Sequence, residues 1–476
     1  MRRKHPARKA PITPLSEDEL AVPRKGIDRG VLVAKLKGLK HDVAPGLGCL
    51  RNEHLLALLL NPNCQLTPSA ARAVDNLCDF ANAVVQVRLP RWFYVGWVAC
   101  RLVPANKVDP ADLPPGTPAD CRPVNIGGSL QRLVTRAYYD DGLQETYNSI
   151  IGPVQNGVGV KGGISITAYG VQAVLDAEPT FCVFQGDLKN GYNEIGREAI
   201  LSAMREEEQL DDTLSYTHAL LEPEAYVGMG NGTALVTAPF RVSEGVHQGA
   251  IESGWLFSLG CNKAFQALNR RLAPHGGGVM AIVDDNYAMG PPEAVFPAKD
   301  EFAVNIAKVG LELQNSKSQC YIRNEYRNGE WDELRGEVPN GVLKDSAGAA
   351  VTGDDGQPLH DITVCNVPVG SRKFVEGYLE QKKTKIVKGF DKAVSLLDPC
   401  RWPHPEIPTR QMIWVLLLVC FQNMGDYWLR HIRPDYTKQF AKGIDAGVRS
   451  LFQTCVGCDI TRWSDFAKEL IILGHC

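Results

Sequence analysis

Two short apolar segments that lead into carboxylates constrain this chain more than any other feature. In the first, an apolar run at residues 181–184 is followed by Gln185-Gly186-Asp187. In the second, Asp284-Asp285 lies between the apolar residues 279–283 and 287–289. Short apolar runs bounded by polar residues predict buried strands. We therefore expect Asp284 and Asp285 on the turn of a hairpin, with Asp187 at the exit of a neighbouring strand.

The pattern around these strands predicts one compact arrangement. Apolar residues at helical spacing predict helices, and a further strand is expected near Leu313. The resulting order is strand, helix, hairpin, helix, strand, which is that of a split βαβ, ferredoxin-like unit. Residues 325–360 are rich in Gly and Asp and predict loops or a small hairpin, and the last 110 residues predict helices. The helices expected beside the carboxylate strands are 194–207, 254–272 and 302–309.

Composition sets limits on the class of protein. The chain has 476 residues, of which 44% are hydrophobic, enough for a packed core in several domains. Its net charge of −3 means that any phosphate-binding surface must gather its positive charge locally. Residues 1–40 are basic; a solvated tail is expected, with an arm that touches nucleic acid as the alternative. The longest apolar run, Ile413 to Phe421, is about half of a bilayer span and predicts a buried helix, so no membrane partner is expected.

The cysteines indicate a reduced compartment. Fourteen Cys are scattered along the chain, and no apolar segment of a secretory signal follows the basic start. We therefore expect an intracellular protein, with nucleus or cytoplasm left open. Cys455 and Cys458, with His475 and Cys476, could bind zinc, although core cysteines are the favoured interpretation.

Four Asp-Asp pairs occur, and their context distinguishes them. A catalytic pair must be held rigidly between two strands, and only Asp284-Asp285 has an apolar run on each side. The pair after Tyr138-Tyr139 follows a helical stretch with Arg132 and Arg136, where surface ion pairs are expected. The pair after Gly353 lies in a Gly-rich loop and predicts a turn. The four pairs are Asp140-Asp141, Asp211-Asp212, Asp284-Asp285 and Asp354-Asp355.

The favoured carboxylates suit phosphoryl transfer. Asp187, Asp284 and Asp285 on adjacent strands could bridge two Mg²⁺ ions about 4 Å apart. Such a pair activates an attacking hydroxyl and stabilises the leaving pyrophosphate, while the protein supplies positioning and charge. The sequence therefore predicts a nucleotidyltransferase with Asp187, Asp284 and Asp285 as metal ligands.

Several motifs resemble those of reverse transcriptases of the non-LTR retrotransposon type. Residues 187–193, DLKNGYN, resemble the first palm motif, in which an aromatic residue follows the Asp by five positions. The later motifs resemble, in order, the Gln-Gly motif, the Asp-Asp turn, the motif after that turn, and the primer grip. They are Gly245–Gly249, Ile282–Asp285, Gly310–Leu313 with Lys317, and Val367–Gly370. Upstream, Leu102–Lys107 and Arg122-Pro-Val resemble the fingers strands, and Ala44–Gly46 with Arg51–His54 the N-terminal extension, so the match is colinear from about 41 to 440.

The resemblance implies an α+β, right-hand polymerase with fingers, a ferredoxin-like palm and a helical thumb. It also implies an RNA template, a nucleic-acid primer and deoxynucleoside triphosphates as partners, with no expectation for the oligomeric state. The implied parts are a basic arm and helical N-terminal extension at 1–95, fingers at 96–180, a palm at 181–370 with a loop-rich insertion at about 325–360, and a thumb and C-terminal region at 371–476.

The same resemblance implies substrate-binding roles. Lys107 and Arg122 would clamp the triphosphate, as paired cations can. Tyr192 would be the steric gate that excludes a 2′-hydroxyl, and Gln248 and Gly249 would line the template and the nucleotide. Lys317 would protonate the pyrophosphate or offset its charge.

Three departures from the family pattern leave alternatives open. Ile282 replaces the usual aromatic residue, Ala250-Ile251 replaces Asp-Pro, and Asn366 replaces a Gly. One alternative is a degenerate or domesticated nucleic-acid-binding protein without catalysis. The other is an RNA-directed RNA polymerase, against which the bulky Tyr192 argues.

Overall fold

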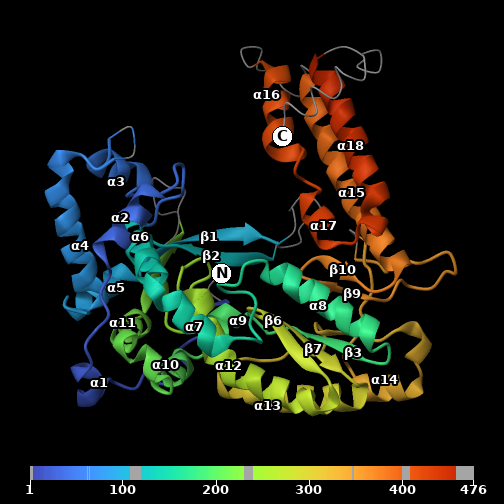
Figure 1. Ribbon diagram of the computed structural model, residues 1–476, viewed down its shortest axis with the longest axis horizontal. Helices are drawn as coiled ribbons and strands as arrows, with labels where there is room; N and C mark the ends of the chain where they lie inside the picture. The colour runs from blue at the N-terminus through green and yellow to red at the C-terminus, as the bar shows by residue number, and fades with distance from the viewer. Residues whose placement is uncertain are drawn as a thin grey trace. The chain divides into compact units, whose positions relative to one another are not determined.

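The computed structural model describes residues 4–61, 63, 65–107, 120–229, 240–345, 348–398 and 408–456. The chain divides into two compact units: unit 1 contains 1–163 and 184–318, and unit 2 contains 164–183 and 319–476. Each unit mixes helices with short strands (Figure 1), which confirms the expected α+β class. The finer division into four parts at 95, 180 and 370 stays a prediction.

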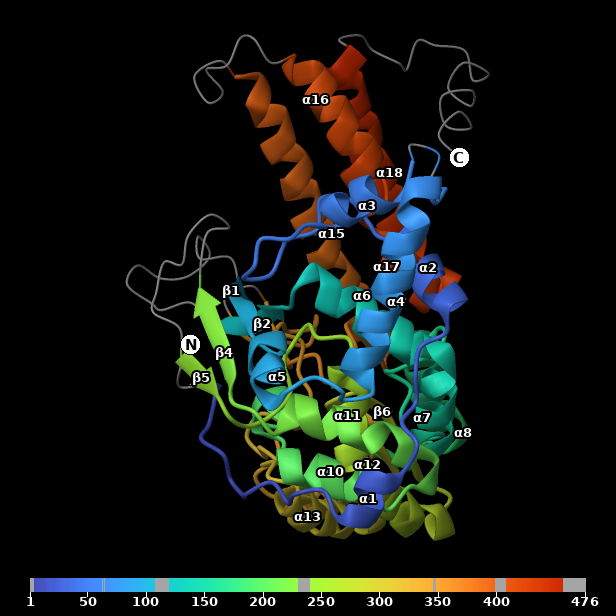
Figure 2. The same ribbon diagram turned by 90° about the vertical axis from the view of Figure 1, so that its left-hand side faces the viewer.

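Unit 1 holds most of the helices. Its N-terminal helices are α1 Glu17–Ala21, α2 Arg29–Lys37, α3 Asn52–Leu59, α4 Ala71–Val85, α5 Arg91–Trp97, α6 Ser129–Tyr138 and α7 Gln144–Ile151. The helices further along are α9 Gly191–Glu194, α10 Arg197–Arg205, α11 Asp211–Leu221, α12 Ser253–Leu272 and α13 Pro292–Lys308. Helix α12 is central because it buries both aromatic and aliphatic side chains along its length; Figure 2 shows α10 close to it.

A first sheet in unit 1 has the order β2-β1-β4-β5. Its strands are β1 Cys100–Asn106, β2 Cys121–Ile126, β4 Ala225–Met229 and β5 Phe240–Val242. Strand β1 pairs with β2 in antiparallel register, with Ala105 opposite Arg122, and with β4 in parallel register. The residues Cys100, Leu102, Val227 and Val242 form the buried face of this sheet. Strand β2, which carries Arg122, is held to this packed face through its pairing with β1.

The second sheet contains the predicted carboxylate strands, in the order β6-β7-β3-β8. Its strands are β3 Cys182–Gly186, β6 Gly278–Ile282, β7 Asp285–Gly290 and β8 Gln319–Tyr321; the unit boundary falls within β3. The predicted chain order of strand, helix, hairpin, helix, strand is confirmed by β3, α12, β6-β7, α13 and β8. The strand expected near Leu313 is wrong, because Leu313 makes only a single bridge to Leu188 and the strand begins at Gln319.

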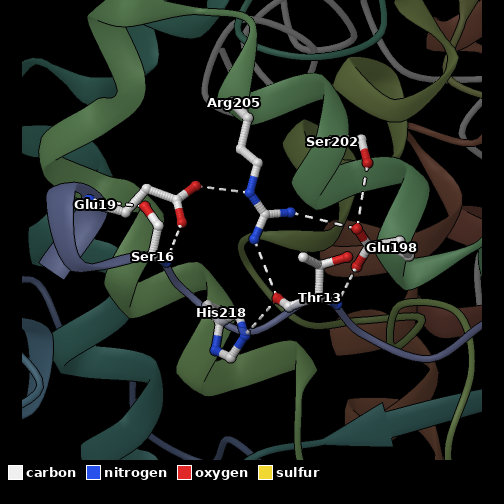
Figure 3. A network of polar contacts seen from close by, with 7 residues as sticks. All are labelled: Thr13, Ser16, Glu19, Glu198, Ser202, Arg205 and His218. Carbon is white, nitrogen blue, oxygen red and sulfur yellow. Dashed lines mark hydrogen bonds and ion pairs between the residues drawn. The ribbon is translucent and has the colours of Figure 1, made fainter.

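The first residues of the chain lie along unit 1 as a defined segment, which we call the N-terminal strap (residues 4–19). Arg205 of α10 donates to the Glu19 carboxylate at 2.7 Å and to the Thr13 carbonyl at 3.1 Å. The Thr13 N–H donates to Glu198 at 2.8 Å, and Ser16 caps α1; Figure 3 shows this network with His218 and Ser202. The expectation of a solvated tail is therefore wrong for the strap, because its backbone and charges bind other parts of the chain.

Unit 2 contains helices, one small hairpin, strand β8 and the first two residues of β3. Its helices are α8 Gly163–Ala177, α14 Gly329–Arg335, α15 Arg372–Val394, α16 Thr409–Leu416, α17 Asp426–His431 and α18 Pro434–Val456, and its hairpin strands are β9 Ile362–Val364 and β10 Val367–Val369. Helices α15 and α18 run side by side (Figure 1), which confirms the helical C-terminal region. The short helix α14, anchored by buried Trp331, lies in the stretch expected to be loops.

The apolar run near residue 413 is less buried than expected. Ile413, Leu417 and Phe421 are buried, whereas Val415 is 54% exposed and Val419 69% exposed. By length and composition alone, the helical segment Thr409–His431 could cross a membrane, with a mean hydropathy of 1.3 over its most apolar window. The core helices of soluble proteins meet the same criterion, so this segment alone does not indicate a membrane span. The expectation of a fully buried helix is wrong here.

Candidate active site

The turn that carries the favoured carboxylates is a two-residue hairpin loop. Ile282 of β6 pairs with Asp285 of β7, which leaves Val283 and Asp284 at the tip. Val283 has a positive φ of 59°, a conformation that costs energy for a β-branched residue and persists only where neighbouring groups enforce it. The expected tight turn between two strands is confirmed, but the placement of Asp285 on the turn is wrong, because Asp285 is already the first residue of β7. The backbone of the turn is strained at Val283, the residue before Asp284.

A buried glutamine holds the strained residue. Gln155 is 4% exposed; its Oε1 accepts from the Val283 N–H at 2.7 Å, and its Nε2 donates to the Val283 carbonyl at 3.2 Å. The segment around it pairs with β6, since Asn156 N–H donates to the Ala281 carbonyl at 2.7 Å. Gly157 passes so close that a Cβ there would lie 2.6 Å from the Val283 nitrogen. The hairpin tip is therefore fixed from outside its own strands.

Asp187 lies at the exit of β3, as expected. Its N–H donates to the Ser318 hydroxyl at 3.0 Å, and its carbonyl accepts from the Gln314 N–H at 2.9 Å. Strand β7 is tied to the end of β3 by Asn286, whose Nδ2 donates to the Gly186 carbonyl at 3.1 Å. These contacts fix the backbone on both sides of the gap between Asp187 and the Asp-Asp turn.

The three carboxylates share one electrostatic neighbourhood. Desolvation raises the pKa of Asp284, and the negative charge of Asp187 raises it further. Desolvation, then the charges of Asp284 and Asp187, raise the pKa of Asp285 to about 6, although its side chain still reaches solvent. The positive charge of Arg122 opposes both shifts. Three acids that repel one another beside one cation make a site that favours added positive charge.

The donor set suits a hard cation, although it is not a closed protein cage. Within the described part of the chain, no three His, Cys, Asp or Glu side chains are grouped so as to hold one metal ion. Mg²⁺ prefers oxygen ligands and commonly takes only one or two carboxylates, completing its shell with water and substrate phosphates. The carboxylates of Asp187, Asp284 and Asp285 fit that mode of binding by chemistry and by charge.

The two predicted triphosphate-binding cations lie in different surroundings. Arg122 is exposed on β2 and acts on the carboxylates through its charge. Lys107 instead forms a 2.7 Å ion pair with Asp120, which also pairs with Lys4 of the strap. Lys107 and then Lys4 lower the pKa of Asp120 to about 2. The charge of Arg122 therefore acts on Asp284 and Asp285, while Lys107 is engaged with Asp120 at the ends of β1 and β2.

Tyr192 lies on the one-turn helix α9 beside the Asp-Asp turn. Its ring stacks on Phe257 of α12 at a centroid distance of 5.1 Å and an interplanar angle of 13°. Burial, with a contribution from the charge of Asp284, raises its pKa well above the ordinary value. A Cβ on the preceding Gly191 would lie 3.4 Å from the Asp284 Cβ. The predicted gate and the predicted metal ligand are therefore neighbours.

Gln248 and Gly249 lie in the turn before α12 and contact strand β2. The Gln248 carbonyl accepts from the Asn125 N–H at 2.7 Å. Gly249 has a φ of 102°, and a Cβ there would lie 2.8 Å from the Asn125 carbonyl oxygen, so glycine is required by both conformation and space. The motif thereby links the strand that carries Arg122 to α12, which carries Phe257.

The last predicted residue, Lys317, lies exposed in the turn just before Ser318. Its N–H donates to the Gln314 carbonyl at 3.1 Å, in the segment that also bonds Asp187. Its backbone is thus one residue from a direct contact of Asp187, and its proposed role stays a prediction.

The surface pairs expected for Asp140-Asp141 and the turn expected for Asp354-Asp355 are found. Asp140 pairs with Lys35 and Asp141 with Lys25 at 3.8 Å; the predicted surface pairs exist, although their partners are not Arg132 and Arg136. Asp355 accepts from the Gln357 N–H at 3.1 Å within a turn. Asp211 and Asp212 begin α11. For the zinc alternative, Cys458, His475 and Cys476 lie outside the described residues.

Sequence reasoning missed Gln155, Asn286 and the strap. Asn286 follows the acidic pair directly and precedes the apolar residues 287–289. A polar residue at the start of an apolar strand is the signal that could have marked it. Gln155 carries no such signal, because its partner is 128 positions away.

Comparisons with known proteins find similarity among solved structures, but not among family models or curated proteins. No family model matches the chain, and no curated protein matches it. A solved structure of apo telomerase from Candida tropicalis, truncated from its C-terminal domain, is similar with 10% identity and a TM-score of 0.35. The likeness covers 48% of this chain and 50% of that chain, so the match spans half the length of that telomerase chain.

Proposed function

We propose that this protein is an RNA-directed DNA polymerase, a reverse transcriptase of the non-LTR retrotransposon type. It would extend a nucleic-acid primer on an RNA template with deoxynucleoside triphosphates. The observation that carries the proposal is the placement of β3, which leads to Asp187, beside the β6-β7 hairpin of Asp284 and Asp285, whose tip is strained at Val283. Strain and crowded acids cost stability, and such costs cluster at functional sites.

Two Mg²⁺ ions, held by Asp187, Asp284 and Asp285, would supply the Lewis-acid chemistry of nucleotidyl transfer. The side chains of the site would do the rest by positioning and charge. Arg122 would bind phosphate oxygens of the nucleotide, and Lys107 would join it after leaving Asp120. Lys317 would offset charge on the leaving pyrophosphate.

Nucleotide selection would depend on Tyr192. Its ring is held flat against Phe257 beside Asp284, so a sugar bound near that carboxylate would meet a fixed aromatic wall. A 2′-hydroxyl would collide with this wall, whereas a deoxyribose would fit. Gln248 and Gly249 would line the template and the nucleotide from the turn before α12.

The proposal includes the architecture of a right-hand polymerase. The fingers would be at 96–180, the ferredoxin-like palm at 181–370 and the helical thumb within 371–476. The strand order β6-β7-β3-β8 supports the ferredoxin-like palm, because it places β3, which leads to Asp187, beside the hairpin of Asp284 and Asp285.

Primer extension on an RNA template with Mg²⁺ tests the proposal, with deoxynucleotides and ribonucleotides in parallel reactions. Extension with deoxynucleotides only is expected. Extension with ribonucleotides only would replace the proposal by an RNA-directed RNA polymerase.

A second candidate is a nucleic-acid-binding protein without catalysis. The low net charge of the chain favours it, as do the departures from the family pattern at Ile282, Ala250-Ile251 and Asn366. Binding of a primer–template with no extension at any Mg²⁺ concentration would select this candidate.

A further inference from the structure

Lys9 of the N-terminal strap has all three of its ammonium hydrogens engaged at one place. Its Nζ donates to the Glu194 carbonyl at 2.7 Å, to the Glu194 carboxylate at 2.7 Å and to the Gly310 carbonyl at 2.5 Å. An ammonium group has three donors, so this lysine is saturated although its side chain remains 34% exposed. Bonds from an ammonium to carbonyls and a carboxylate are charge-assisted and stronger than neutral ones.

The groups that Lys9 joins come from separate parts of the sequence. Glu194 ends α9, the helix of Tyr192, and Gly310 begins the segment that runs to the contacts of Asp187. The Lys9 N–H also donates to the Glu244 carboxylate at 2.5 Å. Glu244 is 2% exposed, and its other oxygen accepts from the Arg197 N–H at 2.7 Å. One strap residue therefore bonds to α9, to residue 310 and to the residue before the Gln-Gly segment.

Helix α9 depends on such outside contacts. It has only four residues, and a single helical turn has no stability of its own in water. Two other fixed points are the Tyr192 carbonyl, which accepts from the Val246 N–H at 2.7 Å, and the stacking of Tyr192 on Phe257. Just after α9, the Gly196 N–H donates to the Val309 carbonyl at 2.9 Å. Without Lys9, that backbone bond remains, but Glu194 at the end of α9 loses its link to Gly310.

We propose that Lys9 is a positioning residue for nucleotide selection, holding α9 so that Tyr192 keeps its place beside Asp284. The inference rests on the proposed polymerase function. Lys9 makes no contact with Asp187, Asp284 or Asp285 and would not touch the nucleotide; it acts through Glu194 and Gly310. The basic start of the chain thus serves as an internal clamp.

Lys9→Met tests the proposal, because methionine keeps most of the apolar stem and removes the three donors. Lys35→Met is the matched control: Lys35 also lies near the N-terminus, is 30% exposed and pairs with Asp140, which is 24% exposed. The side chains of Lys9 and Glu194 are 34% and 20% exposed, so the two ion pairs are similar in exposure. Neither Lys35 nor Asp140 contacts α9 or the three carboxylates Asp187, Asp284 and Asp285.

The first readout is the kinetics of extension. Lys9→Met is expected to raise KM for deoxynucleotides with a smaller change in kcat, and to lower discrimination against ribonucleotides by about tenfold, the scale of a displacement below 1 Å. Lys35→Met should match the wild type in KM for deoxynucleotides and in discrimination against ribonucleotides. Equal KM and equal discrimination in Lys9→Met and Lys35→Met would overturn the proposal.

The second readout does not need activity. Amide hydrogen exchange of residues 191–196 and 309–311 should be faster in Lys9→Met than in the wild type and in Lys35→Met. If the wild type extends no primer, the polymerase function fails while this exchange still decides whether Lys9 holds α9. Unchanged exchange at these amides would overturn the positioning role in either case.

Discussion

The side-chain amide of Gln155 binds both backbone polar groups of Val283, accepting from its N–H at 2.7 Å and donating to its carbonyl at 3.2 Å. Val283 is the residue with positive φ at the hairpin tip, and Asp284 follows it. A bidentate contact from outside the hairpin therefore sets the direction in which the Asp284 carboxylate leaves the turn. Precise placement of metal-binding groups requires support of this kind.

Replacing Gln155 by leucine should impair catalysis more than stability. The buried N–H and carbonyl of Val283 would lose their partner, which costs about 1–3 kcal/mol of unfolding free energy. A misplaced Asp284 should lower kcat by about a hundredfold. Denaturant titration and primer extension measure the two effects. Gln86→Leu is the control, because Gln86 Nε2 donates to the Arg24 carbonyl at 3.2 Å, at the end of α4 and outside the segment that holds the hairpin. A Gln155→Leu enzyme that works at the wild-type rate would contradict this account of the hairpin.

Removing the ring of Tyr192 should open the site to ribonucleotides. Tyr192→Ala deletes the wall that stacks on Phe257, so discrimination measured as the ratio of kcat/KM for the two nucleotide types should fall by at least about tenfold. Tyr192→Phe keeps the wall and should keep the selectivity of the wild type. If Tyr192→Ala remains fully selective, the gate lies elsewhere.

Asp361 should make stability depend on pH. It is 1% exposed, and desolvation raises its pKa to about 6 against the opposing hydrogen bonds of Ser371 and Tyr321. A raised folded pKa means that the folded state binds the proton more tightly than the unfolded state. Stability from this group is therefore present at low pH and is lost as pH rises through about 4 to 6.

Asp361→Asn removes that titration and should stabilise the protein at pH 8 by on the order of 3 kcal/mol. The advantage should shrink as pH falls below 6 and be nearly gone at pH 4. Thermal melting across this range measures it, with the exposed turn variant Asp355→Asn as the control. A melting difference between Asp361→Asn and wild type that is the same at pH 8 and pH 4 would rule out the buried carboxyl as its source.

The parts of the fold that follow from local pattern were predictable from the sequence. Strands β3, β6 and β7 and helix α12 each carry a clear apolar pattern, and the polar turn at Asp284-Asp285 marks the hairpin. Strand β8 was expected several residues too early, because Leu311 and Leu313 are apolar and yet form a turn with one bridge to Leu188. Helix α14 was missed, because its seven residues include four charges and only one buried anchor, Trp331.

The supports of the site were not predictable, since they depend on partners far away in the chain. Gln155 lies 128 positions from Val283, and Lys9 lies 185 from Glu194 and 301 from Gly310. An extended strap has no periodicity, and its Lys and Arg look like those of a solvated tail. That the strap's Lys and Arg side chains bond carbonyls and carboxylates of the same chain is visible only in the folded structure.

The most direct test of the central claim compares Asp284→Asn with Asp354→Asn in single-turnover primer extension with Mg²⁺. Both variants remove one carboxylate of an Asp-Asp pair and keep its size, and equal melting temperatures would show that both are folded. The account predicts that Asp284→Asn slows extension by about a thousandfold or more, equivalent to losing about 4 kcal/mol of transition-state stabilisation, while Asp354→Asn extends like the wild type. Wild-type extension by Asp284→Asn, or a dead Asp354→Asn enzyme, would contradict it.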